Sequence, residues 1–73
     1  MNIAVTKPTA VVDILMESKI PATPEEARAL IRGGTVRLNG ETVRRGSVLI
    51  YPEDVPAVLR VGRYHRIDLE GGS

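Results

Sequence analysis

The 73-residue sequence contains no cysteine, no phenylalanine and no tryptophan. Without cysteine, neither a disulfide nor a thiolate metal site can form. Only Tyr51 and Tyr64 supply aromatic side chains, whereas proteins that bind single-stranded nucleic acid usually stack bases on several. No apolar run approaches the roughly 20 residues of a membrane span, and the N-terminus does not resemble a signal peptide. We therefore expect a cytoplasmic protein without a membrane partner.

Side chains suited to catalysis are equally scarce. His65 is the only histidine, and the three serines lie in no recognisable nucleophile motif. The adjacent Glu25 and Glu26 fit the first turn of a helix, where acids meet the positive end of the helix dipole. One histidine and scattered carboxylates give no metal-ligand spacing. The sequence thus predicts a domain that is not an enzyme by itself and uses no metal or other cofactor.

Arginine, in contrast, is abundant and concentrated. The whole chain has a net charge of only +1, but residues 27–66 hold eight arginines and three acids, a net charge of +5. Both flanking segments are acidic. Because arginine pairs bidentately with phosphate, this distribution favours a polyanion contact on one side of the molecule. With so few aromatic residues, the expected polyanion is a structured RNA that is bound by its backbone and shape.

The clearest helix signal begins at Thr23, a good N-cap. Pro24 suits the first helical position, and Glu26 occupies the place of a capping-box acid. Two glycines follow Arg32 and end the pattern, because glycine takes the left-handed conformation at little steric cost. We therefore expect a helix over residues 24–32.

An earlier amphipathic pattern predicts a helix over residues 9–18, with Thr9 as its N-cap. Residues 1–8 are expected to be a flexible arm or the end of a linker, and residues 70–73 a flexible tail. The domain itself is predicted to span residues 9–69.

Strands are expected after the second helix, and Asn39-Gly40 is a strong hairpin signal. The predicted strands cover residues 35–38, 41–43, 48–50, 57–61 and 64–69. The register of the last pair stays open. A two-residue turn at Gly62 and Arg63 mixes apolar and charged side chains on both faces, whereas a longer loop changes which side chains share a face.

Several of these residues together resemble the S4 RNA-binding domain, over residues 9–69. The resemblance is carried by Glu26-Ala27-Arg28, Leu30-Ile31, Gly33-Gly34, Val36 and Asn39-Gly40. Residues 57–67 are similar to the S4 domain at the C-terminus of bacterial tyrosyl-tRNA synthetases. The resemblance implies an α+β fold of the S4 (alpha-L) type, in which two N-terminal helices pack on a small, mainly antiparallel curved sheet. Many relatives have two adjacent basic residues where this chain has Arg28 and Ala29.

The resemblance to the synthetase domain also implies a function and partners. Such an appendage binds tRNA, notably its long variable arm, while catalysis resides in a separate synthetase domain of a longer chain. The isolated domain is expected to be a monomer. Two alternatives stay open: a free-standing S4 protein that binds ribosomal RNA or the ribosome, and a protein-interaction module for an acidic partner.

Seven residues are candidates for RNA contact: Arg28, Arg32, Arg37, Asn39, Arg44, Arg45 and Lys19. Arg28 and Arg32 share one face of the predicted helix because they are four residues apart. If the apolar residues of the next strand face the helices, Arg37 faces solvent and completes an arginine clamp for phosphate. Each has a purely structural alternative, such as pairing of Arg28 with Glu25 or a turn requirement for Asn39.

Overall fold

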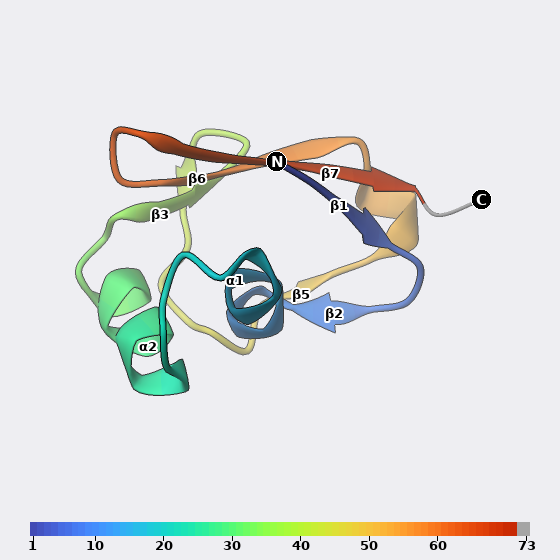
Figure 1. Ribbon diagram of the computed structural model, residues 1–73. Coiled ribbons are helices and arrows are strands. Elements are labelled where there is room, and N and C mark those ends of the chain that lie inside the picture. The colour runs from blue at the N-terminus through green and yellow to red at the C-terminus, as the bar shows by residue number, and fades with distance from the viewer. Residues whose placement is uncertain (72–73) are drawn as a thin grey trace.

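The computed structural model describes residues 1–71, which form an α+β domain of two layers. Figure 1 shows a five-stranded sheet lying over two short helices and a small second sheet. The large sheet has the order β1 (Asn2–Val5), β7 (His65–Gly71), β6 (Ala57–Val61), β3 (Val36–Leu38) and β4 (Glu41–Thr42). The other layer holds α1 (Val11–Ser18), α2 (Pro24–Arg32), and the pair β2 (Thr9–Ala10) and β5 (Leu49–Ile50). A 3-10 turn, η1 (Pro52–Asp54), connects β5 to β6.

The N-terminal residues form a strand. β1 pairs in parallel with β7, and its side chains Ile3 and Val5 are buried, with 6% and 1% of their surface exposed. The prediction of a flexible arm over residues 1–8 is therefore wrong for β1. Its partner strand, β7, lies at the other end of the chain, so residues near β1 in the sequence do not indicate the pairing. The tail prediction is also wrong for Glu70 and Gly71, which belong to β7, and residues 72–73 lie outside the described part.

The N-cap of the first helix is Ala10, one residue later than the expected Thr9. Thr9 pairs with β5 instead of capping α1, and its Oγ1 donates to the carbonyl oxygen of Lys7 at 2.8 Å. The first N–H groups of α1 are satisfied by a distant loop. The amide of Val11 donates to the carbonyl of Val48 (2.9 Å), and the amide of Val12 to that of Gly46 (3.2 Å). Backbone carbonyls thus replace the expected side-chain cap.

The second helix, α2, has the predicted bounds and the predicted start. The backbone N–H of Glu26 donates to Thr23 Oγ1 at 3.2 Å. The carboxylate of Glu26 reaches one residue further back than a standard capping box and accepts from the amide of Ala22 at 2.9 Å. After the helix, Gly34 takes the left-handed conformation, with φ of +75°. The helix therefore ends here, and the chain continues directly into β3.

The hairpin between β3 and β4 forms at the predicted dipeptide. Asn39 and Gly40 have φ values of 51° and 87°, as a two-residue type I′ turn requires. Asn39 also continues the sheet beyond β3. Its Oδ1 accepts from the amide of Val58 at 2.9 Å, and its own amide donates to the carbonyl of Val58 at 2.8 Å.

The register between β6 and β7 separates apolar from charged side chains. Val61 pairs with His65, so the connecting loop has three residues. The inner face, toward the helices, carries the buried residues Ala57, Leu59, Val61, Ile67 and Leu69. The outer face carries Val58, Arg60, Arg66 and Asp68 by strand alternation. The longer of the two loop lengths is thus the one that forms.

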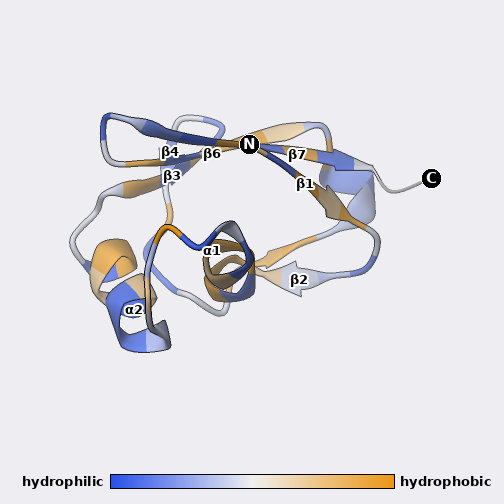
Figure 2. Cartoon of the chain, in the orientation of Figure 1, coloured by the Kyte–Doolittle hydropathy of each residue, from blue (hydrophilic) through white to orange (hydrophobic). Residues whose placement is uncertain are grey.

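The hydrophobic core fills the space between the two layers. The inner sheet face meets the apolar faces of the helices, with Val11, Ile14 and Leu15 from α1 and Ala27 and Ile31 from α2. In Figure 2 hydrophobic colour marks α1, whereas hydrophilic colour marks the end of the sheet where β6 turns into β7. No helix among residues 1–71 has the length and apolar character needed to cross a membrane.

Candidate nucleic-acid interface

Two of the candidate arginines project from α2, whose buried side is formed by Ala27 and Ile31. Arg28 and Arg32 are both exposed. Residues four apart on a helix are neighbours on its surface, so these two guanidinium groups share one side of α2. The predicted placement of Arg28 and Arg32 on one exposed side of α2 is therefore confirmed, while their contact with phosphate stays a prediction.

A loop from a distant part of the chain brings the second arginine pair to α2. Gly46, directly after Arg44 and Arg45, packs between the two helices. A Cβ atom at position 46 would lie 3.2 Å from the Cβ of Val12 and 3.5 Å from Cδ1 of Ile31. The loop that follows Arg44 and Arg45 therefore packs against α2, the helix that carries Arg28 and Arg32. We call Arg28, Arg32, Arg44 and Arg45 the helix–loop surface.

In the described part of the chain, the arginines of the helix–loop surface have no carboxylate partner. Within residues 1–71 the only ion pair joins Arg66 to Asp68, with 3.0 Å between Nη2 and Oδ1. The alternative that Arg28 is neutralised by Glu25 is therefore not realised. Beside Arg44 and Arg45 lies a shallow hollow of about 340 Å³, bordered also by Leu38, Glu41, Thr42, Val43 and Val48. Unpaired guanidinium groups next to a concave surface suit an anionic ligand.

Arg37 does not join the arginines of α2. Val36 is buried and Leu38 partly buried, so both face the helices as predicted. Arg37 then projects from the opposite face of the sheet, because successive side chains of a strand alternate. The predicted clamp of Arg28, Arg32 and Arg37 is wrong in this respect: a residue that points away from the helices lies on the far side of the sheet from α2.

Lys19 and Asn39 occupy positions that the backbone itself explains. Lys19 is the C-cap of α1, with φ of 62°, and its amide donates to the carbonyl of Met16 at 3.2 Å. It lies at the other end of α1 from the loop that holds Arg44. Asn39 uses its Oδ1 to extend the sheet. RNA contacts by the Lys19 ammonium or the Asn39 Nδ2 group stay predictions.

A second group of arginines lies on the outer face of the sheet, where the sequence alone did not place them. Arg37 pairs with Arg60, and Arg60 with Arg66, so the three lie directly opposite one another across β3, β6 and β7. All three are exposed. We call Arg37, Arg60 and Arg66 the outer arginine row. The registers of the β3–β6 and β6–β7 pairs together reveal it, and the sequence left the second of them open.

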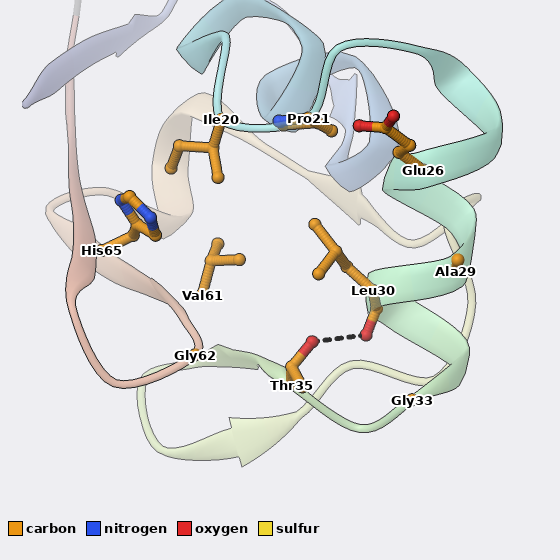
Figure 3. Close-up of a pocket in the computed structure, with 10 residues that line it drawn as sticks. All are labelled: Ile20, Pro21, Glu26, Ala29, Leu30, Gly33, Thr35, Val61, Gly62 and His65. Atoms are coloured by element: carbon orange, nitrogen blue, oxygen red, sulfur yellow. Dashed lines mark hydrogen bonds between the residues drawn. The ribbon is translucent and has the colours of Figure 1, made fainter.

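An apolar pocket of about 500 Å³ opens at one end of the domain, between α2 and the β6–β7 loop (Figure 3). The side chains of Ile20, Leu30 and Val61 point into it, with His65 and Glu26 at its edge. Thr35 closes one side, and its Oγ1 donates to the carbonyl of Leu30 at 2.7 Å. Among residues 1–71, no three histidine or acidic side chains are grouped to hold a metal ion.

No model of a known protein family matches this sequence, and no curated protein matches it.

Proposed function

We propose that this chain is an S4-like domain that binds structured RNA through the helix–loop surface. One observation carries the proposal. Gly46 packs against Ile31, so a loop with two exposed arginines lies against the helix that carries two more. Within residues 1–71 none of these four arginines pairs with a carboxylate. Fold stability does not explain such an arrangement, whereas phosphate binding does.

RNA is the polyanion that best fits this surface. The two exposed tyrosines lie elsewhere: Tyr51 follows β5 and Tyr64 is in the β6–β7 loop. A surface with arginines and no aromatic ring contacts phosphates rather than unstacked bases. Because duplex RNA is recognised mainly through its backbone and 2′-hydroxyl groups, a helical region of a folded RNA is the expected ligand.

The finer assignment within this proposal is a tRNA-binding appendage of a tyrosyl-tRNA synthetase, with the long variable arm as its ligand. It is supported by the sequence resemblance and by the order of elements, in which two helices precede a hairpin with Asn39 and Gly40 at its turn. In this reading the domain does no catalysis, and a synthetase domain would lie elsewhere in a longer chain. The parallel strand β1 is an addition that the resemblance did not imply.

The experiment compares a tRNA that has a long variable arm with the same tRNA lacking that arm, by fluorescence anisotropy over a range of salt. If three to four phosphates are neutralised, the log–log slope of affinity against salt should be about −3. Arg32→Gln and Arg45→Gln should each weaken binding about tenfold, since a charge-assisted hydrogen bond contributes roughly 1.5–3 kcal/mol.

The matched control is Lys7→Gln, which removes one exposed positive charge outside the helix–loop surface and should leave affinity nearly unchanged. Affinity that does not depend on salt would contradict the proposal. Tighter binding to an acidic protein than to any RNA would favour the protein-interaction alternative. Equal affinity for the two tRNAs would reject the variable arm while leaving RNA binding intact.

A further inference from the structure

A charged hollow lies on the outer face of the sheet, at the end where β6 turns into β7. It measures about 380 Å³ and is lined by Gly34, Thr35, Arg37, Arg60, Gly62 and Arg63. Arg37 and Arg60 are direct cross-strand partners, and like charges in that position destabilise a sheet. Within residues 1–71 neither pairs with a carboxylate, since the only ion pair involves Arg66. An anion held between them would remove this repulsion.

The apolar pocket of Figure 3 lies on the inner side of the same end of the sheet. Its volume of about 500 Å³ falls within the range of about 300–1,000 Å³ that is typical of small-molecule sites. Ile20, Leu30 and Val61 give it apolar walls, while His65 and Glu26 supply hydrogen-bonding groups at its edge. Such a lining suits a planar ring with polar edges.

The charged hollow and the apolar pocket share a wall. Thr35 and Gly62 line both, and the amide of Gly62 donates to the carbonyl of Thr35 at 2.9 Å. Gly62 has φ of +64°, and no atom lies within 4 Å of the place where its Cβ would be. At Gly62, the barrier between the two compartments is therefore backbone without a side chain. A ligand that reached around it would place an anionic group on one side and a ring on the other.

We infer that this end of the sheet holds one unpaired nucleotide of the bound RNA. Its phosphate lies among Arg37, Arg60 and Arg63, and its base enters the pocket beside Leu30 and Val61. The inference rests on the proposed function and adds a second contact, on a different part of the surface. The nucleotide must be unpaired because a base inside a duplex is stacked and inaccessible, whereas a bulged base is cheap to extrude.

Three RNA hairpins with the same stem test this inference on the intact chain. One is fully paired, one has a single-nucleotide bulge, and one has an abasic residue at the bulge. The bulged hairpin should bind about tenfold more tightly than the paired one, because burial of the base among apolar side chains adds to the affinity. The abasic hairpin should shift the amide resonances of Arg60 and Arg63 but leave those of Leu30 and Val61 unchanged.

Two variants separate the two compartments. Ala29 is exposed and lines the pocket, so Ala29→Leu should fill it and remove the preference for the bulged over the abasic hairpin. The matched control is Ala22→Leu, the same change at an exposed position outside the pocket lining, which should keep the preference. Arg60→Gln should weaken binding of the bulged and abasic hairpins alike, by about tenfold, as loss of one charge-assisted phosphate contact predicts.

The outcomes distinguish this inference from the proposed function. If no hairpin binds, the proposed function fails and the nucleotide site with it. If all three hairpins bind equally, RNA binding stands and the nucleotide site is refuted. A preference for the bulge that survives Ala29→Leu would likewise overturn the assignment of the base to this pocket.

Discussion

Substitutions at Asn39 separate the two reasons for which an asparagine can stand at this turn. The residue has φ of 51°, and its Oδ1 accepts from the amide of Val58 at 2.9 Å. Asn39→Ala removes this hydrogen bond, which contributes about 1 kcal/mol. It also places alanine in the left-handed region, at a cost of roughly 1–2 kcal/mol. The free energy of unfolding should therefore fall by about 2–3 kcal/mol.

Two further variants separate the contribution of the hydrogen bond from that of the backbone conformation. Asn39→Gly loses the hydrogen bond but accepts the positive φ, so it should cost only about 1 kcal/mol. Asn39→Asp keeps an acceptor oxygen for the Val58 amide and should be the least destabilised of the three. Urea denaturation followed by circular dichroism gives the midpoints at constant m-value. A loss for Asn39→Asp as large as that for Asn39→Ala would refute the structural role assigned to Oδ1.

The remaining predictions use the same denaturation assay. Thr23→Ala should cost about 1 kcal/mol through loss of the cap on α2. Ile3→Ala should cost about 2–3 kcal/mol because the Ile3 side chain is buried. A loss below about 0.5 kcal/mol would mean that this position is exposed. Leu30→Ala should cost about 1–2 kcal/mol, less than a fully buried leucine, since Leu30 is only partly buried. Gly46→Ala should cost about 1–3 kcal/mol by overpacking and should also weaken RNA binding, because it displaces the loop from α2.

The sequence was most informative where the determinants of structure are local. The start of α2 at Thr23 and Pro24, and the turn at Asn39 and Gly40, depend on residues within a few positions of one another. Capping and turn geometry are properties of short segments, so both were predicted correctly. The α+β class followed from them, together with the helical pattern that became α1.

The features that were missed depend on pairs of residues far apart in the chain. β1 has only two inward apolar side chains, Ile3 and Val5, and its partner β7 lies at the other end of the sequence. Thr9 was expected to cap α1, but the carbonyls of the loop at Gly46 and Val48 do so instead. Neither arrangement has a local signature, because both arise only when the loop and the terminal strands pack together.

The prediction for Arg37 was correct about the direction of its neighbours in β3 but wrong about its distance from the arginines of α2. Its neighbours in β3 do face the helices, as expected. Arg37 was expected to lie near Arg28 because both are exposed to solvent. Two exposed residues, however, need not lie on the same side of the molecule. In a two-layer domain the exposed side of the helices and the exposed side of the sheet look in opposite directions, so residues solvated on different layers are separated by the core.

Because of this separation, the arginines of the basic segment lie on two surfaces instead of one. The net charge of +5 in residues 27–66 suggested one surface, yet the fold divides its arginines. Four form the helix–loop surface, while Arg37, Arg60 and Arg66 form the outer arginine row. Arg37 and Arg60 reach the outer face by strand alternation. The three-residue loop between Val61 and His65 places Arg66 beside them, since a shorter loop would move charged side chains of β7 to the inner face. A rigid straight duplex cannot follow both sides of the domain. Simultaneous use of the two surfaces therefore requires an RNA that bends or extrudes a nucleotide around the end of the sheet, where Gly62 leaves the backbone bare.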